Sequence, residues 1–227
     1  MTGMSNYTAN NFLDTIVGRS SYTSPTGVYL ALFNAVGTDV GTGFTEVSGT
    51  GYARANASGS TYWGAATGTA PATITNSASG IAFPQATASW GTVVAWGLYD
   101  YSGVSAGNLL FWDFLGNDPW FPFTSISGAA SGVFTAIGIT AGSSPNLANG
   151  SSIVFTNEYG GTLPTSITEY TVYTVSGLTN DVFYAANPTA VSASTTAAGM
   201  VRQITQQSIP ANVTASFNTS NLTLTAA

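Results

Sequence analysis

The chain has 227 residues, a formal net charge of −6 and few charged side chains. Only 5% of its residues are Asp, Glu, Lys or Arg, against about 25% in an average soluble domain. It contains no lysine, histidine or cysteine. These absences remove the commonest acid–base group, the thiolate that serves as nucleophile or metal ligand, and the amine that forms Schiff bases. We therefore expect a protein that is not an enzyme, holds no metal and needs no cofactor.

The charge distribution also limits the partners. The three basic residues, Arg19, Arg54 and Arg202, are scattered along the sequence. Tight phosphate binding needs several clustered cations, and anionic membranes attract basic clusters in the same way. No apolar run approaches the roughly 20 residues of a membrane span. We expect no nucleic acid and no membrane as partner. A surface of Ser, Thr, Asn and Gly repels little, which favours a chain that is normally assembled with others.

Residues 5–18 predict the clearest helix. Four apolar residues at i, i+3, i+4 and i+7 share one helical face: Ala9, Phe12, Leu13 and Ile16. Ser5 is a suitable N-cap, and Gly18 is a suitable stop after the last turn. Two interpretations stay open. Either the helix covers one end of a β core, or it docks onto a neighbouring protein.

From residue 26 the sequence predicts strands, as short apolar and β-branched segments between Gly, Asn and Pro. They cover residues 28–33, 52–55, 72–75, 81–83, 92–100, 108–112, 213–217 and 222–225. Segment 28–33 shows little alternation, so both of its faces should be covered. Segments 92–100 and 108–112 should form a hairpin with a medium loop.

An aromatic cluster follows this hairpin and ends in two Pro–aromatic pairs. Two prolines in four residues argue against a central strand, because proline donates no hydrogen bond to a neighbour. A loop with this many apolar residues must be buried, either against the core of its own chain or in a pocket of a partner. Together with two helix residues, the cluster supplies the candidate protein-interface residues: Phe12, Ile16, Trp112, Trp120, Phe121 and Phe123.

Residues 132–204 have a different sequence pattern from the residues before them. Short strand-like segments recur about every ten residues, separated by Gly, Asn and Pro turns. This spacing is typical of a small β-sandwich or barrel-like module. The sequence as a whole predicts a mainly β protein, with a β-sandwich-like domain that carries one N-terminal helix and a second, small all-β module.

A series of blocks resembles a widespread family of small phage virion proteins, usually labelled tail-fibre-like or virion structural proteins. The blocks keep their order and spacing over residues 5–7, 22–33, 46–54, 76–77, 81–84 and 90–111. Residues 209–225 resemble the hairpin that closes this family, displaced to a later position. The intervening segments 149–156, 161–164, 170–175 and 180–183 are similar to a second β module of phage and bacterial surface proteins.

The displaced closing hairpin implies an insertion. We expect a host β domain at residues 1–131 and 205–227, interrupted by an inserted β module at residues 132–204. Insertions of this kind succeed at exposed loop tips, and the tip of a hairpin is such a place.

Three groups of residues invite more specific interpretations. Asp113 and Asp118 lie five apart, and paired carboxylates hydrolyse glycosides, but nothing in the sequence identifies a cleft for them. Three acids near glycine-rich loops offer oxygen ligands for Ca²⁺, although no spaced calcium motif accompanies them: Asp39, Glu46 and Asp100. The tryptophans allow a sugar platform, an interface or a core, and we favour the core: Trp63, Trp90, Trp96, Trp112 and Trp120. Because cations are scarce, Arg54 should be paired with a carboxylate or a carbonyl.

The resemblance implies a virion protein without catalytic residues and leaves its place in the particle open. The sequence has no collagen-like tract, coiled coil or long repeat. We therefore favour a capsid cement or decoration protein on the outer surface of the head, which binds other copies of itself and the major capsid protein and stabilises the head. The alternative is a short tail fibre or baseplate appendage that binds tail proteins and takes part in host attachment.

Overall fold

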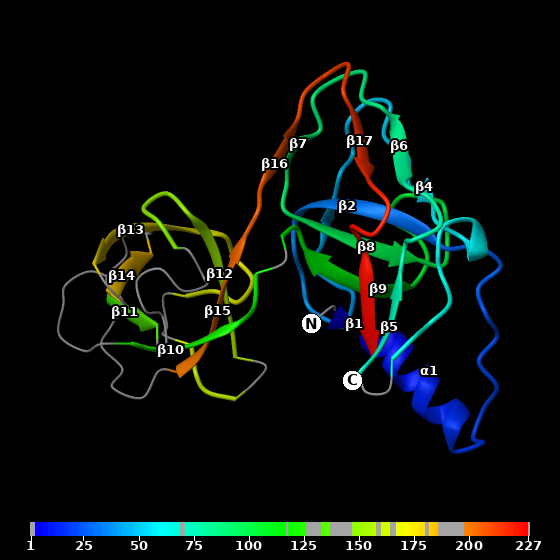
Figure 1. The fold of residues 1–227 in the computed structure, drawn as a ribbon, viewed down its shortest axis with the longest axis horizontal. Helices are drawn as coiled ribbons and strands as arrows, with labels where there is room; N and C mark the ends of the chain where they lie inside the picture. Colours follow the sequence, from blue (N-terminus) through cyan, green and yellow to red (C-terminus); the bar gives the residue numbers. More distant parts are fainter. Residues whose placement is uncertain are drawn as a thin grey trace. The chain divides into compact units, whose positions relative to one another are not determined.

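The computed structural model describes residues 3–68, 71–116, 118–125, 133–136, 147–157, 160–163, 167–179, 182–185 and 198–226. The chain divides into two compact units (Figure 1). Unit 1 comprises Met1–Leu115 and Gln207–Ala227, and unit 2 comprises Gly116–Gln206. Antiparallel strands make up most of the regular structure, and the described residues contain one α-helix, near the N-terminus. The predicted mainly β class with an N-terminal helix is therefore confirmed.

The helix α1 (Asn6–Ile16) begins and ends where its capping residues predict. The Ser5 side chain accepts a hydrogen bond from the backbone N–H of Thr8, which satisfies one of the free donors of the first turn. At the other end Gly18 has a φ of +71°, a conformation that costs little only for glycine. Its N–H donates to the carbonyl of Thr15, and the next N–H, of Arg19, donates to Asp14. These two bonds define a Schellman stop.

Unit 1 is built on a six-stranded antiparallel sheet of order β1-β9-β8-β2-β3, with β4 also paired to β2. Its strands are β1 (Gly3–Met4), β2 (Tyr29–Ala35), β3 (Thr45–Glu46), β4 (Ala55–Asn56), β8 (Ala95–Tyr99) and β9 (Leu109–Phe114). The predicted hairpin is confirmed, because β8 pairs with β9 directly. Both faces of β2 are covered, as its lack of alternation predicted. The strand predicted at residues 52–55 is wrong in part: only Ala55 lies in β4, and Tyr52 instead directs its hydroxyl toward the sheet.

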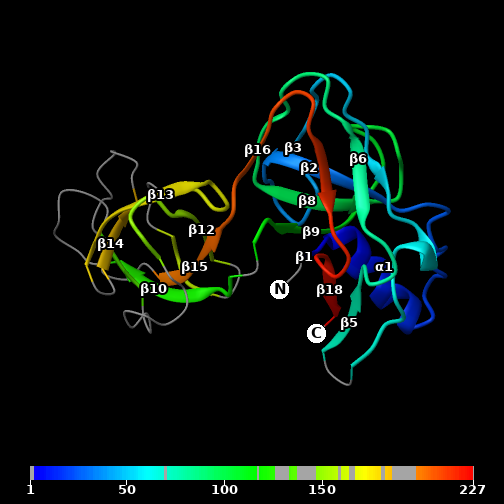
Figure 2. The same ribbon diagram turned by 45° about the horizontal axis from the view of Figure 1, so that its top comes forward.

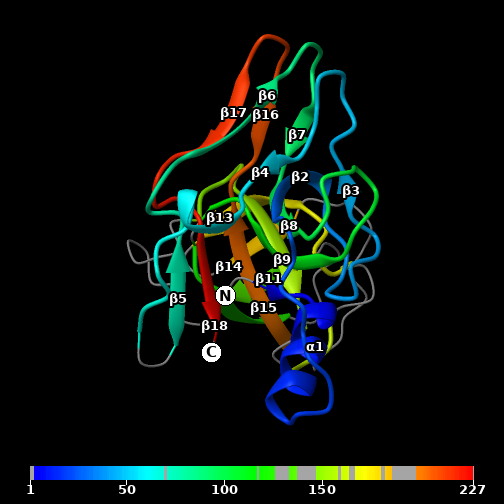
Figure 3. The same ribbon diagram turned by 90° about the vertical axis from the view of Figure 1, so that its right-hand side faces the viewer.

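The last segment of unit 1, residues 207–226, pairs antiparallel with residues 72–93. The pairs form three short two-stranded ribbons (Figures 2 and 3). The pairs are β7 (Gly91–Val93) with β16 (Gln207–Ile209), β6 (Ile81–Gln85) with β17 (Thr214–Phe217), and β5 (Ala72–Thr75) with β18 (Thr223–Ala226). A short 3₁₀ turn, η1 (Gly59–Thr61), precedes them. Ribbon residues Ile81 and Phe83, and Leu222 just before β18, share one buried core with sheet residues Leu30 and Trp96. The predicted sandwich-like arrangement thus consists of one sheet packed against ribbons.

Unit 2 is a closed barrel of order β10-β11-β14-β13-β12-β15 (Figure 1). Its strands are β10 (Phe121–Ser125), β11 (Val133–Ala136), β12 (Ser152–Thr156), β13 (Tyr173–Thr179), β14 (Val182–Ala185) and β15 (Ala198–Ile204). Side chains from several strands fill its core, among them Phe123, Ile153, Phe155, Tyr173 and Val201. Closure removes the open edges that a small sheet would otherwise expose. Unit 2 therefore has a core of its own.

The prediction that the aromatic segment around Pro122 is a loop and no central strand is wrong. Phe121–Ser125 is β10, a barrel strand with neighbours on both sides. Pro122 lies opposite Met200 of β15, and among the described residues the pairing with β11 begins only at Phe123, so the missing N–H of Pro122 is tolerated there. The division into units consequently differs from the predicted domains at residues 116–131. Those residues precede the predicted module, yet their described strand pairs with β11 and β15 of unit 2.

The chain passes from unit 1 to unit 2 and back again. In each unit, the two points at which the chain crosses lie close together. In unit 1, Leu115 donates its backbone N–H to the carbonyl of Val94 at 2.9 Å, and Gln207 pairs with the adjacent Val93. In unit 2 the first and last strands, β10 and β15, are neighbours, with Phe121 opposite Val201. Each unit is therefore closed without the chain of the other.

Candidate functional site

The helix α1 exposes its apolar face. Four large apolar side chains on the last turns are more than half exposed: Phe12 (54%), Leu13 (59%), Ile16 (64%) and Val17 (74%). No residue of α1 is buried. The interpretation of α1 as a cover for one end of the β core is therefore wrong, because a covering helix buries this face. The interpretation as a docking helix remains, and as candidate interface residues Phe12 and Ile16 lie at the surface.

Small polar side chains, in place of the apolar ones, fix α1 to the sheet. The buried Ser5 hydroxyl donates to the carbonyl of Leu109, and its N–H donates to Leu110. Thr8 donates its hydroxyl to the carbonyl of Leu110 at 3.0 Å. Further along, Thr15 accepts a hydrogen bond from the backbone of Tyr22, in the segment that follows the helix. The helix is thus held by Ser and Thr and leaves its apolar residues outward.

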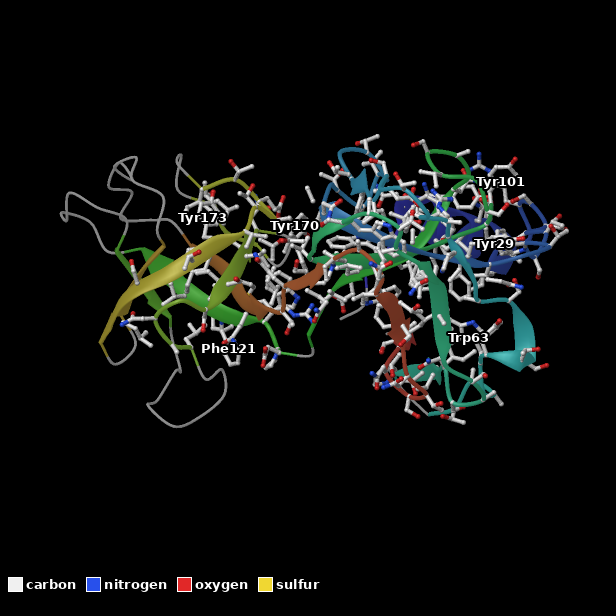
Figure 4. The ribbon with its side chains drawn as sticks, turned by 90° about the horizontal axis from the view of Figure 1, so that it is seen from above. Tyr29, Trp63, Tyr101, Phe121, Tyr170 and Tyr173 are labelled. Carbon is white, nitrogen blue, oxygen red and sulfur yellow. The ribbon has the colours of Figure 1, made fainter. Side chains whose placement is uncertain are left out.

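The four aromatic candidates lie deeper than the helix residues. Trp112 is 4% exposed and Phe123 is 1% exposed, in the cores of unit 1 and unit 2 respectively. Trp112 packs edge-on against Phe44 and donates its indole N–H to Asp39 at 2.7 Å. A side chain this buried offers no face to a partner, so both residues are corrected to core positions. Trp120 and Phe121 are half-buried, with Phe121 on β10 (Figure 4).

A buried ion pair organises the loop between β8 and β9. Arg54 donates from Nε and Nη2 to the two carboxylate oxygens of Glu46, at 2.8 and 2.7 Å. The side chains of the pair are 1% and 8% exposed. The remaining terminal nitrogen, Nη1, donates to the carbonyls of Tyr101 and Ala106, each at 2.8 Å. The predicted pairing of Arg54 with a carboxylate or a carbonyl is confirmed for both, and the two carbonyl contacts connect loop 101–107 to the ion pair.

Two tyrosines complete the surroundings of this ion pair. The Tyr52 hydroxyl donates to Glu46 at 3.0 Å and accepts from the N–H of Leu32. Burial, together with the nearby Glu46 charge, raises the pKa of Tyr52 well above its usual range. Tyr99 stacks under the Arg54 guanidinium, 3.6 Å from its ring centre. Burial raises the pKa of Tyr99 to about 12, although the Arg54 charge acts in the opposite direction.

Loop 101–107 presents a surface that sequence reasoning missed. Its Tyr101 is 55% exposed at the edge of unit 1 (Figure 4), and Val104 is also exposed. Arg54 fixes the loop from below, and Asp100 caps it by accepting two hydrogen bonds from Asn108. The hairpin pattern predicted a loop here, but nothing in the sequence indicated that Arg54 donates to its carbonyls.

In the described part of the chain, the acidic residues do not form a metal site. Asp39 accepts from Trp112, Glu46 from Arg54 and Asp100 from Asn108, so each suggested calcium ligand has a protein donor. Among the described residues no group of three or more acidic, His or Cys side chains is placed to hold a metal ion. Asp113 and Asp118 belong to different units.

Four of the five tryptophans are core residues, as favoured from the sequence. Trp63, Trp90, Trp96 and Trp112 are at most 9% exposed. An aromatic residue this buried presents no open ring for stacking on a sugar, so these four form no sugar platform. Trp120 is half-buried, and Arg202 lies over its ring at 5.8 Å. Within the described ranges, the structure also has no helix long and apolar enough to span a membrane.

Residues 3–118 match the family described as Podophage GP4 fiber I protein gp80. Because this match covers just over half of the chain, the chain belongs to that family, which consists of phage virion structural proteins of the fibre type. The match confirms the resemblance carried by residues 5–111. Such structural fibre proteins are typically non-enzymatic. A search of the curated proteins found no match.

Proposed function

We propose that this chain is a short fibre or appendage of a phage tail, in which unit 1 attaches to the virion and unit 2 is an inserted module that faces the host. The observation that carries the proposal is the extent of the family match. It ends at residue 118, close to Leu115 where unit 1 gives way to unit 2. The matched part is therefore the N-terminal segment of unit 1, which supports the proposal that the barrel is an addition to a family domain.

The proposed partners follow from the same reasoning. Unit 1 binds other copies of the chain and tail proteins of the particle, through apolar and neutral polar contacts. Nucleic acid and membranes are not among the partners, because the three arginines form no basic cluster in sequence and Arg54 is already paired with Glu46.

A second candidate is a cement or decoration protein on the outer surface of the head, bound to the major capsid protein. The low charge content of the chain, 5%, favours it. A protein that covers joints in a capsid lattice meets many neighbours at once, and a neutral surface avoids like-charge contacts with all of them.

The copy number in purified particles distinguishes the two candidates. Quantitative mass spectrometry of the virion, with the major capsid protein as internal standard, measures it directly. A fibre or appendage is present in a few copies at the tail, whereas a cement protein is present in numbers that follow the capsid lattice. A lattice-scale copy number would overturn the fibre proposal in favour of the capsid candidate.

Removal of unit 2 tests the role of the inserted module. Phage that carries a chain with residues 117–206 replaced by a short Gly–Ser linker should assemble, retain the chain in the particle and adsorb poorly to its host. Normal adsorption of such particles would contradict a role of the barrel in attachment. Heads that lose stability to heat or chelators would instead support the cement function.

A further inference from the structure

The apolar face of α1 is turned away from the body of unit 1. A surface helix ordinarily turns its apolar stripe toward the core and its polar side toward solvent. The side-chain hydrogen bonds that join α1 to the rest of the unit involve Ser5, Thr8 and Thr15, while Phe12, Leu13 and Ile16 are more than half exposed. Exposure of an apolar face of this kind to water is unfavourable for an isolated chain, which points to a partner for it.

The charges around the face restrict what that partner is. Asp14 is the sole charged residue of α1, and it pairs with Arg19 just beyond the helix at 3.6 Å. A membrane-binding helix carries Lys and Arg on its polar side, and α1 has neither. A strongly charged partner would gain no ion pair here. The face suits an equally neutral apolar surface.

A second copy of the same chain supplies such a surface. When identical patches meet across a symmetry axis, every charge faces its own equivalent, so a charged patch repels itself and a neutral one does not. Ala9, Phe12 and Ile16 also follow the three–four spacing with which helices interlock along a shared seam. We propose that the apolar face of α1 is the contact through which one copy of this chain binds another.

The size of the face sets the expected strength of the contact. Its apolar patch is on the order of a few hundred Å², below the roughly 800 Å² per partner of a standard stable interface. The contact should therefore be weak and reversible for the free chain, and it becomes effective in a particle that already holds copies near each other. The inference rests on the proposed function only in assuming that copies of the chain work together in a virion.

Sedimentation equilibrium of the full chain between about 10 and 500 μM, near the affinity range of small interfaces, tests the proposal. The weight-average mass of the wild type should rise above 23.1 kDa with concentration. The double variant Leu13→Asp/Ile16→Asp should stay monomeric throughout. Val40→Asp/Val213→Asp is the matched control, because both residues are exposed outside the apolar face of α1 (67% and 41%) and the two substitutions add the same charge. This control should associate like the wild type.

Cysteine cross-linking provides a second readout, because a disulfide traps even a weak contact between two copies. The chain has no cysteine of its own, so Leu13→Cys places a single thiol at the centre of the face. Mild oxidation should yield a covalent dimer many times faster than for Val40→Cys. Since no residue of α1 is buried, all these variants should keep the wild-type unfolding midpoint.

Three results would overturn the proposal: a wild type that stays monomeric at every concentration, a double variant that associates like the wild type, or equal cross-linking at positions 13 and 40. None of these results bears on the copy number or adsorption of the virion, so failure of this contact is separable from failure of the proposed function.

Discussion

Arg54 is the residue whose loss should affect unit 1 most. Replacement by alanine leaves Glu46 buried without its partner and removes the donor from two loop carbonyls. Breaking a buried ion pair by removing one partner costs about 3 to 5 kcal/mol. We expect Arg54→Ala to lower the free energy of unfolding of unit 1 by this amount in guanidinium titrations. Tryptophan fluorescence follows this unit, because four of the five tryptophans lie in it.

The exposed pair of Arg19 with Asp14 is the matched control for this prediction. Its two side chains are 78% and 37% exposed, and pairs of this kind contribute little or nothing measurable to stability. Arg19→Ala should therefore leave the midpoint of unfolding unchanged. Equal effects of the two alanine substitutions would show that the Arg54–Glu46 pair does not stabilise the unit.

The tyrosines around this ion pair predict sensitivity to alkaline pH. In the unfolded chain a tyrosine has a pKa near 10, whereas in the folded state the pKa of Tyr99 is raised to about 12 and that of Tyr52 is raised further. Between these values the folded state holds protons that the unfolded state has lost. The stabilisation is complete below about pH 10 and declines as the pH rises through 12. Thermal unfolding at a series of pH values measures this, and Tyr99→Phe should flatten the decline. An unchanged slope in that variant would rule out Tyr99 as its source.

Among the elements, β8 depends on one glycine for its packing. A Cβ atom on Gly97 would lie 2.6 Å from a ring carbon of Phe33 and 2.9 Å from a methyl carbon of Leu109. Alanine ordinarily gains about 0.5 to 1 kcal/mol over glycine in a strand, but overpacking of a buried site costs about 1 to 3 kcal/mol. We expect Gly97→Ala to destabilise unit 1 in the same guanidinium titration. A variant as stable as the wild type would mean that Phe33 moves aside without cost.

The elements also show what sequence reasoning can reach. The bounds of α1 follow from local signals, namely the side chain of Ser5 and the backbone freedom of Gly18. Its orientation does not, because periodicity tells which residues share a face and says nothing of what covers that face. For β10 the local signal was misleading: Pro122 argued against a strand, and the neighbour that accommodates it, β15, lies some 80 residues further on. The pairing of Arg54 was foreseen from the scarcity of charge, while the choice of Glu46 depends on the folded sheet.

At the scale of the whole molecule, the adjacency of chain ends predicts that the units are independent. A chain in which residues 117–206 are replaced by a short Gly–Ser linker should fold, because the two residues to be joined already lie close together. Leu115 bonds to Val94, and Gln207 pairs with the adjacent Val93. The isolated segment 116–206 should fold as well, because its first and last strands pair. Each product should give one cooperative thermal transition by circular dichroism. Failure of either to unfold cooperatively would show that the units depend on each other.

The ribbons formed by β16, β17 and β18 determine when unit 1 becomes complete during synthesis. Ile209 of β16 and Leu222, just before β18, are part of the buried core, and they leave the ribosome after all of unit 2. The barrel is contiguous in sequence and is able to fold first, as domains do during translation. Unit 1 must wait, and its pairings span more than a hundred residues. A chain whose synthesis stops early therefore carries a finished barrel on an open, unfinished core, which gives chaperones and proteases a means to remove it before assembly.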